Sequence, residues 1–311
     1  AGTGGQGLKI GSKGKLYWLD VDEVTLIPWI FQGSNYGYSL GGDGNNTIIE
    51  KFTFASAGNT SDVADLTKSG HNPAGTSSAD HGYSIGGVST DVIDRFTFAA
   101  DANAADVGDL TANRSHMASA SDADYGYIAG GAGALNIIER FANASSADSA
   151  DVGDITVART EPTGHTSATH GFAAGGDAGA TKHNVIDKFA FASSANGVDW
   201  GDISAESSGG SAGSDTDYGY IAGGNTASSY VNIIERFPFA SSAGISDVGD
   251  LTKNITWASG QSSTTTGYKC GGHPNGSTIN EMEYYSFASS GNGADWGDLT
   301  AASKYNAGVQ Y

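Results

Sequence analysis

Residues 218–252, YGYIAGGNTASSYVNIIERFPFASSAGISDVGDLT, contain the pattern that decides the fold. An aromatic strand ends in a double glycine, a second apolar strand follows, and the segment closes on Asp-Val-Gly-Asp-Leu-Thr. The double glycine recurs with spacings of 45, 44, 45, 48 and 48 residues at Gly41-Gly42, Gly86-Gly87, Gly130-Gly131, Gly175-Gly176, Gly223-Gly224 and Gly271-Gly272. Such self-similarity at a fixed period indicates a repeat architecture with six copies of one unit.

A second sequence marker recurs with nearly the same spacings as the double glycine. The sequence Asp-Val-x-Asp-Leu, or a close variant, recurs at spacings of 44, 45, 48, 48 and 48 residues. It begins at Asp62, Asp106, Asp151, Asp199, Asp247 and Asp295. Two independent markers in step define a repeat of 44–48 residues that accounts for residues 34–311.

Each repeat contains four short segments with the two-residue alternation of β-strands. In and around the first repeat they are the aromatic segment before Gly41, residues 48–54, residues 62–67 and a polar segment such as 117–121. No segment long enough to form a helix shows helical periodicity. Four strands in a repeat of about 40–50 residues are typical of a propeller blade. The sequence therefore predicts an all-β, six-bladed β-propeller with four strands per blade.

The two ends of the chain predict how the ring closes. The last repeat stops at Tyr311, where the next Gly-Tyr strand should begin, and that strand occurs instead at Tyr36-Gly37-Tyr38. We expect the C-terminal strand to pair with the first blade. This pairing would remove both open sheet edges, which could otherwise template aggregation.

The charge balance limits the partners. The net charge is −19, and residues 1–33 are balanced, with three lysines against Asp20, Asp22 and Glu23, so the excess acid lies in the propeller. An acidic ring repels nucleic acid and anionic membranes, and we predict binding to neither. No run approaches the roughly 20 apolar residues of a membrane-spanning helix, so we also predict no membrane insertion. A requirement for solubility alone equally explains the acidic composition of the propeller.

Residues 1–33 do not fit the repeat. A Gly-rich start is followed by two apolar groups, at residues 17–19 and 26–31. These groups are too apolar for a free tail, and two interpretations stay open: a brace that covers part of the propeller, or an arm that docks it onto something larger. Trp18, Trp29 and Phe31 are the predicted anchoring side chains.

Acidic residues recur in the second strand, each followed by Lys, Arg or, in the last repeat, Tyr284. They are Glu50, Asp94, Glu139, Asp187, Glu235 and Glu283. A feature present in every blade indicates scaffold rather than an active site, and strand neighbours point to opposite faces, so each adjacent pair is not one ion pair. We predict a structural role for them.

Metal and nucleophile signals are weak. The Asp pairs of the third strand, Asp62/Asp65 through Asp295/Asp298, are expected to cap turns rather than to bind calcium, which needs six to eight oxygens. The seven histidines are scattered, and the single cysteine, Cys270, is expected to be buried. The sequence predicts no enzyme, catalytic residue, metal or cofactor; an enzyme acting in the central channel is the least favoured alternative.

Length variation is confined to one connection, between the double glycine and the second strand. Measured to the Phe54 position, this interval is 12, 11 and 12 residues in the first three repeats and 15 in the last three. Insertions confined to one connection map to one face, often the binding face, although neutral drift is the alternative. The longer loops, 177–184, 225–232 and 273–280, carry hydrogen-bonding and aromatic groups suited to a sugar or a protein surface. The candidate ligand-binding residues are Lys182, His183, Tyr230, His273 and Asn275.

The Gly-Tyr-x-x-Gly-Gly strand, followed by Asp-Trp-Gly-Asp or Asp-Val-Gly-Asp, resembles the kelch repeat, with Trp200 and Trp296 downstream of the double glycine. This resemblance covers all six units and implies a propeller used mainly for binding. A few kelch proteins are copper oxidases, but their copper ligands cannot be placed on this sequence.

Residues 233–252 also resemble repeats of structural proteins in marine bacteriophages, cyanophages especially. This likeness implies a virion protein made in the host cytoplasm: a tail fibre, tail tip or capsid appendage. Its expected partners are other virion proteins, reached through residues 1–33, further copies of itself in a homo-oligomer, and a host-surface glycan or protein. A purely architectural module and a non-viral extracellular binding propeller are the alternatives.

Overall fold

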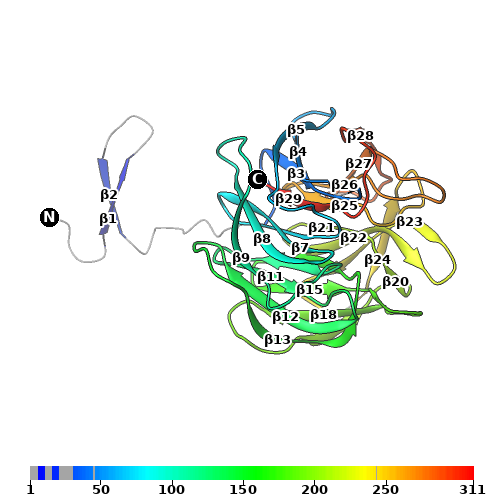
Figure 1. Cartoon of the computed structure of the whole chain (residues 1–311). Coiled ribbons are helices and arrows are strands. Elements are labelled where there is room, and N and C mark those ends of the chain that lie inside the picture. Colours follow the sequence, from blue (N-terminus) through cyan, green and yellow to red (C-terminus); the bar gives the residue numbers. More distant parts are fainter. Residues whose placement is uncertain (1–5, 11–15, 21–30, 45, 243) are drawn as a thin grey trace.

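The computed structural model describes residues 6–10, 16–20, 31–44, 46–242 and 244–311. Six antiparallel sheets are arranged as the blades of a ring (Figure 1), which confirms the predicted six-bladed, all-β propeller. The described residues contain no helix that is long and apolar enough to cross a membrane.

Each blade contains four strands that follow one another from the axis outward. The first three blades, from the inner strand outward, are β29 (Ala307–Gln310), β3 (Tyr36–Leu40), β4 (Ile48–Thr53), β5 (Ser61–Asp65); β6 (Ala74–Ser77), β7 (His81–Gly87), β8 (Thr90–Thr97), β9 (Ala105–Asp109); and β10 (Ala118–Ser121), β11 (Tyr125–Ala129), β12 (Leu135–Ala142), β13 (Ala150–Arg159). The last three are β14 (Thr163–Thr166), β15 (His170–Ala174), β18 (Val185–Ala190), β19 (Val198–Asp202); β21 (Ser211–Ser214), β22 (Tyr218–Thr226), β23 (Tyr230–Pro238), β24 (Ser246–Asp250); and β25 (Ser259–Ser262), β26 (Thr266–Cys270), β27 (Glu281–Ser286), β28 (Ala294–Asp298). Three short additions complete the set: β20 (Ser207–Ser208) beside β22, the pair β16 (Asp177–Ala178) and β17 (Thr181–Lys182), and the pair β1 (Gln6–Ile10) and β2 (Leu16–Asp20).

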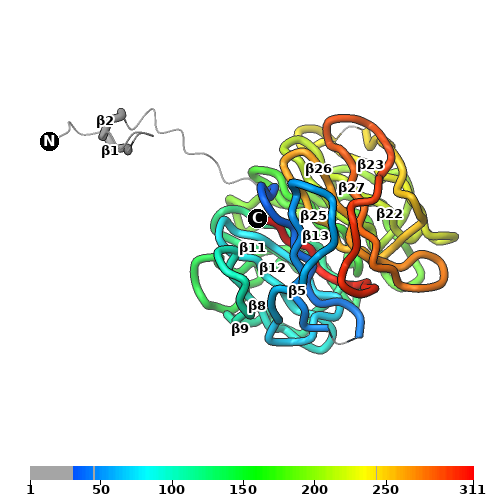
Figure 2. Tube along the Cα trace, turned by 90° about the horizontal axis from the view of Figure 1, so that it is seen from above, coloured from blue at the N-terminus to red at the C-terminus, as the bar shows by residue number. Residues whose placement is uncertain are grey.

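The ring closes as predicted. Strand β29 pairs antiparallel with β3, in a register that runs from Ala307 opposite Leu40 to Gln310 opposite Gly37. The C-terminus therefore lies beside the start of the first blade (Figure 2), and the Tyr311 carbonyl accepts the backbone N–H groups of Ser34 and Asn35. Strand β29 therefore covers the edge of β3 that would otherwise be open toward the axis.

Glycine in the Gly-Tyr pair makes room for an aromatic ring of the neighbouring strand. A Cβ atom added to Gly37 would lie 2.3 Å from the Phe52 ring, and one added to Gly267 would lie 2.3 Å from the Tyr285 ring. Any side chain at these positions would displace the aromatic ring. Those rings then fill the space between blades: Phe96 contacts Tyr38 of the preceding blade with ring centroids 5.3 Å apart.

The recurrent acids join one blade to the next. All six carboxylates are buried, and each accepts the backbone N–H of the residue that follows the third strand's Leu or Ile in the preceding repeat. The last of these bonds, from Thr300 to Glu50, spans the closure of the ring at 2.7 Å. The basic neighbours point away from the acids; for example, the Lys188 ammonium lies 3.6 Å from the centre of the Trp200 ring. This arrangement confirms the expected structural role.

Third-strand aspartates accept backbone N–H groups as expected, but they do so at a bulge within the strand rather than in a turn. The Asp106 carboxylate accepts the backbone N–H of Gly108 at 3.2 Å, and Asp151 does the same for Gly153 at 3.0 Å. Cys270 is fully buried as predicted, and burial raises the pKa of its thiol, which keeps it protonated.

Candidate functional site

The double glycine packs against, and hydrogen-bonds to, the connection that leads to the next inner strand. A Cβ atom on Gly86 would lie 2.3 Å from the Arg114 carbonyl oxygen, so the first glycine allows this connection to pack directly on its backbone. The N–H of the second glycine, Gly87, donates to the same carbonyl oxygen at 2.8 Å. The same bond occurs in every repeat, and it fixes the path of the chain two residues before the ring described next.

Six equivalent residues surround the propeller axis, one from each repeat, and we call them the axial ring. Each lies two residues before an inner strand, and each has a left-handed backbone, with φ between 55° and 65°. They are Asn72, His116, Glu161, Gly209, Trp257 and Tyr305. Only one is glycine, although this conformation costs an L-residue about 1–2 kcal/mol. A strained backbone conformation persists only where the surrounding structure imposes it. Such residues cluster at functional sites.

A closed circle of backbone hydrogen bonds imposes this conformation. The N–H of each axial-ring residue donates to the carbonyl oxygen of its predecessor, and the circle closes with Asn72 donating to Tyr305 at 3.0 Å. The other donor–acceptor distances lie between 2.7 Å, from Trp257 to Gly209, and 3.2 Å, from His116 to Asn72. The six peptide groups are therefore held together, and the side chains of the axial ring can differ without loss of the backbone contacts.

The axial-ring side chains surround a pocket of about 110 Å³ at this end of the axis, which we call the axial pocket. Aromatic side chains form one part of its wall: the Trp257 and Tyr305 ring centroids lie 4.8 Å apart, with an angle of 37° between the rings. His71 stacks on Tyr305 at 5.4 Å, and the His116 ring meets Tyr305 edge-on at 5.8 Å. The pocket therefore combines a supported aromatic surface with polar groups.

The charges near the axial pocket are small in number and mixed in sign. The Lys304 ammonium lies 3.7 Å from the Asp43 carboxylate, and His116 Nε2 lies 3.7 Å from Glu161. Burial lowers the pKa of His116 below its ordinary value, against the opposing effect of Glu161. Burial likewise raises the pKa of Tyr305, with Glu161 adding to the effect. At neutral pH the pocket therefore presents an uncharged imidazole and an un-ionised phenol.

Two of the predicted ligand-binding residues lie against this aromatic surface. The His273 ring stacks on Trp257 with centroids 5.7 Å apart, and Tyr230 meets Trp257 edge-on at 6.0 Å. Backbone pairing between His273 and Thr256 attaches the 273–280 loop to the connection that carries Trp257. Burial, reinforced by Lys304, lowers the pKa of His273. The structure thus brings Tyr230 and His273 together around a residue that the sequence did not single out.

The other three predicted residues are spread more widely. The Lys182 ammonium donates to Ser208 Oγ at 2.9 Å, and this hydroxyl donates to Glu161 at 3.1 Å, so Lys182 reaches the axial ring through one intermediary. His183 is half-buried, and its Nε2 atom is buried with no hydrogen-bond partner in the described part of the chain. Asn275 is exposed at the tip of its loop.

The chain segment that follows the arm enters at the other end of the axis. Here the last residues of the inner strands are linked by five bonds in which a backbone N–H donates to a side-chain oxygen of the neighbouring blade, among them Ser214 to Ser262 at 2.9 Å and Gln310 to Ser77 at 3.0 Å. The Gln32 amide donates to the Ser214 carbonyl oxygen at 3.0 Å, and the Phe31 carbonyl accepts from Gln310 at 3.0 Å. Residues 31–33 therefore pack against the propeller at what we call the arm end; the axial ring marks the ring end.

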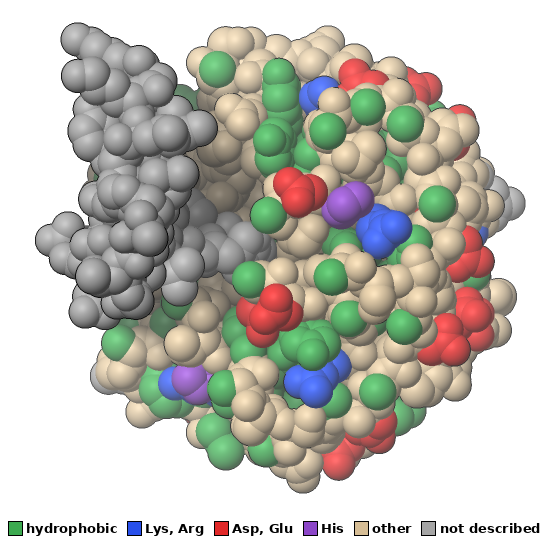
Figure 3. All heavy atoms as spheres, turned by 90° about the vertical axis from the view of Figure 1, so that its left-hand side faces the viewer, with side chains coloured by type: hydrophobic (Ala, Val, Ile, Leu, Met, Phe, Trp, Pro, Cys, Tyr) green, Lys and Arg blue, Asp and Glu red, His purple; other side chains and the backbone are tan. Residues whose placement is uncertain are grey.

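The remaining anchor predictions fall at the edge of the described structure. Trp18 lies in β2, opposite Leu8 of β1, but its side chain is outside the described residues, as is all of Trp29. Phe31 is described, and it lines the channel at the arm end. Figure 3 shows the molecule from the left-hand side of Figure 1, where the visible acidic side chains of the described residues are scattered rather than gathered into one patch.

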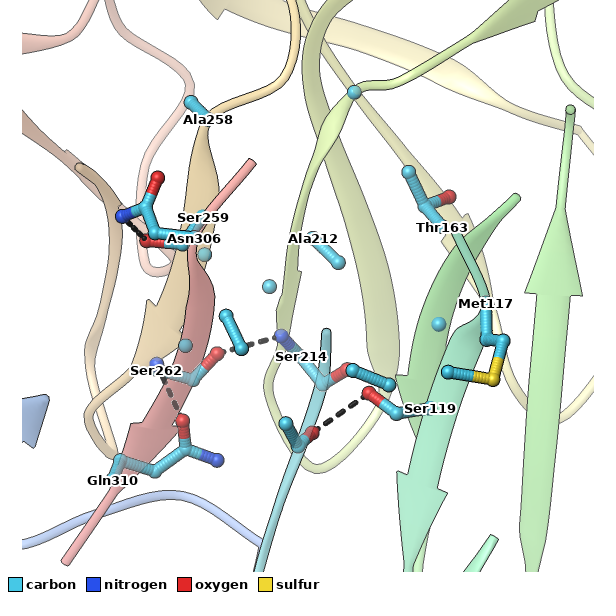
Figure 4. A pocket seen from close by; sticks show the side chains of 18 of the residues that line it. Met117, Ser119, Thr163, Ala212, Ser214, Ala258, Ser259, Ser262, Asn306 and Gln310 are labelled. Atoms are coloured by element: carbon cyan, nitrogen blue, oxygen red, sulfur yellow. Dashed lines mark hydrogen bonds between the residues drawn. The ribbon is translucent and has the colours of Figure 1, made fainter. Parts of the chain in front are cut away.

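The channel between the two ends is narrow and lined by small side chains (Figure 4). It encloses about 130 Å³, and the second residue of each inner strand is Gly, Ala or Ser. These strands approach closely: a Cβ atom on Gly164 would lie 2.1 Å from the Ser119 carbonyl oxygen. Within the described ranges, no group of three or more His, Cys, Asp or Glu residues is placed to hold a metal ion.

The long loops predicted from the sequence lie at the same end of the propeller as the axial ring, but the axial ring itself was not predicted. The signal was available: in a connection of constant length, one position carries Asn, His, Glu, Gly, Trp and Tyr in successive repeats. A position that differs in every copy of a repeat whose neighbours are constrained indicates freedom from the scaffold. The sequence matches no protein-family model and no curated protein.

Proposed function

We propose that this chain is a non-catalytic virion protein, a tail-fibre, tail-tip or capsid-appendage component, whose propeller is displayed for binding to the host surface. The observation that carries the proposal is the separation of two features along the axis. Residues 31–33 pack at the arm end, and the axial ring and the loops attached to it lie at the ring end. A particle that holds the arm leaves the ring end free for a ligand.

Two sequence resemblances support this assignment. The kelch-like double glycine supports a binding role, because propellers with that repeat are used mainly for binding. In this structure it fixes the connection that leads to each axial-ring residue. The likeness of residues 233–252 to marine phage repeats supports a place in a virion, with synthesis in the host cytoplasm. The expected partners are other virion proteins, through residues 1–33, further copies of the chain, and a host-surface glycan or protein.

The use of the carboxylates supports a binding role over a catalytic one. The six recurrent acids that could have served as acid–base groups are buried between blades, where each accepts a backbone N–H of the preceding repeat. A carboxylate engaged in this way stabilises the scaffold and is not free to exchange a proton with a substrate. The channel lining offers hydroxyl and amide groups rather than converging acids.

Adhesion to cells tests the proposal. The purified full chain, fluorescently labelled, should bind intact cells of the host, and shortening each of the three long loops by three residues should weaken that binding. Substitution of the exposed Ala79 by Ser, in a turn at the arm end, is the matched control and should leave binding unchanged. Equal binding by the shortened variant would contradict a role for the ring end. It would favour the purely architectural module instead.

A further inference from the structure

The size of the axial pocket limits what it can bind. Its volume of about 110 Å³ is well below the roughly 300–1,000 Å³ of sites that enclose drug-sized ligands. Pro73 and Met117, each directly before an inner strand, line both this pocket and the channel behind it, so the start of the inner strands forms the floor. A ligand can therefore insert one terminal group only, with the remainder outside.

The aromatic surface is supported from both sides. Trp257 is backed by the stacked His273 ring, and Tyr305 is backed by the stacked His71 ring. Gly209 contributes to this arrangement, because a Cβ atom there would lie 2.7 Å from Trp257 Cδ1. The faces of aromatic rings carry partial negative charge and attract the partially positive C–H groups of a flat aliphatic ring. The Trp257 and Tyr305 rings contact each other, so a ligand ring packs on the parts of them that line the pocket.

The polar side of the pocket has unused hydrogen-bonding capacity. Asn72 is only 7% exposed and lines the pocket, yet its side-chain amide has no hydrogen-bond partner within the described residues. The amide atoms of Asn72 keep access to solvent, so they are available to a ligand that fills the pocket. Glu161 is also available in part: one carboxylate oxygen accepts from Ser208, and the other lies 3.7 Å from His116. An amide and a carboxylate in the wall of one pocket match hydroxyl groups, which both donate and accept.

The local charges disfavour an ionic ligand. An aromatic surface can bind a cation, but the Lys304 ammonium already lies 5.6 Å from the Trp257 ring centre and 5.2 Å from that of Tyr305. A second cation would be repelled by Lys304. An anion would meet Glu161 in the pocket wall and Asp43 beside Lys304. A neutral group with both C–H faces and hydroxyls fits best.

From these observations we propose that the axial pocket binds one terminal neutral sugar residue of a surface glycan. The sugar ring packs on Trp257 and Tyr305, and its hydroxyls hydrogen-bond to Asn72 and Glu161. This inference rests on the proposed function, because it names the chemistry by which the ring end recognises a host surface. Tyr230 and His273 hold Trp257 in place rather than contact the sugar.

The test is binding of the full chain to a glycan array of bacterial surface polysaccharides. It is followed by saturation-transfer NMR with neutral methyl glycosides, and with choline as the cationic probe. Wild type should bind glycans with neutral terminal sugars. Trp257→Gly should weaken binding about tenfold or more, and Trp257→Phe should retain most of it. Glycine at this position reproduces the residue found at Gly209, so the closed circle of backbone bonds should survive. A β-sheet circular-dichroism spectrum and a cooperative melting transition verify that the propeller stays folded.

The outcomes separate this inference from the proposed function. Failure of wild type to bind any glycan, binding of choline alone, or equal glycan binding by Trp257→Gly would overturn the sugar assignment. If wild type and Trp257→Gly adhere equally to host cells, adhesion persists without the axial pocket, and only the sugar assignment is lost. If wild type binds a neutral glycan but not host cells, the sugar site stands and the proposed function is wrong.

Discussion

His165 provides a quantitative test of how closely the inner strands pack. It is the third residue of β14 and is fully buried, with Nδ1 3.0 Å from the Gly213 carbonyl oxygen of the next blade. Its Nε2 atom lies 3.0 Å from Thr163 Oγ1, and its ring meets Phe237 edge-on at 5.0 Å. The site offers no carboxylate to stabilise a charged imidazolium. Burial accordingly lowers the pKa of His165 from 6.5 to about 4.

The sign and size of the effect follow from proton linkage. Below pH 6.5 the unfolded chain binds a proton at this histidine and the folded chain does not, so the free energy of unfolding falls as the pH falls toward 4. The two pKa values differ by about 2.5, which corresponds to a loss of about 3 kcal/mol in full and about 2 kcal/mol by pH 5. Above pH 7 the effect is absent.

The measurement is urea unfolding of wild type and His165→Gln between pH 7.5 and pH 5. Glutamine occupies the equivalent position in β25, as Gln261, and it does not titrate. The buried acids Asp94 and Glu235, whose pKa values are raised mainly by burial, act in the opposite direction but equally in both proteins. Wild type should lose about 2 kcal/mol more than the variant over this range. Parallel pH profiles would show that the site is hydrated and would refute the packing described for the channel.

Three further perturbations test the scaffold by urea unfolding. Glu50→Ala should destabilise the ring by about 2–4 kcal/mol, because it removes the acceptor for the Thr300 N–H across the closure. The control Asp62→Ala, at an exposed position, should change stability by under about 0.5 kcal/mol. Similar losses in the two variants would argue against the inter-blade bonds. Gly164→Ala should cost about 3 kcal/mol through overpacking against Ser119, while Gly291→Ala, which meets open space, should be nearly neutral; a neutral Gly164→Ala would mean that the inner strands are farther apart. Deletion of residues 307–311 removes the whole of β29 and should lead to aggregation, measured by light scattering, because β3 loses its partner; a soluble, cooperatively folding product would contradict closure by this strand.

The repeat alone was enough to predict the blades and their closure. Each blade must place the same side chains in the same register, so markers such as the double glycine report local geometry directly. The structural role of Glu50 and its equivalents was also predictable, because a group repeated in every blade serves every interface. The pairing of β29 with β3 followed from the incomplete first and last repeats.

The axial ring could not be derived in the same way. Its left-handed backbone arises from hydrogen bonds between residues about 45 positions apart, and nothing in the local sequence around Trp257 or Tyr305 favours φ near 60°. Loop length pointed to the same end of the axis, and with it to Tyr230 and His273. The pocket-lining residues themselves lie in connections of constant length, where insertions give no signal.

In the proposed function, the two ends of the propeller axis have different tasks, attachment at the arm end and recognition at the ring end. A cryo-EM map of the particle or filament that contains this chain tests it most directly. We expect residues 1–33 to be enclosed by neighbouring proteins, and the axial ring and the 177–184, 225–232 and 273–280 loops to face outward. A map in which these loops are buried against neighbours would contradict it, and recognition of the host would then belong to another chain.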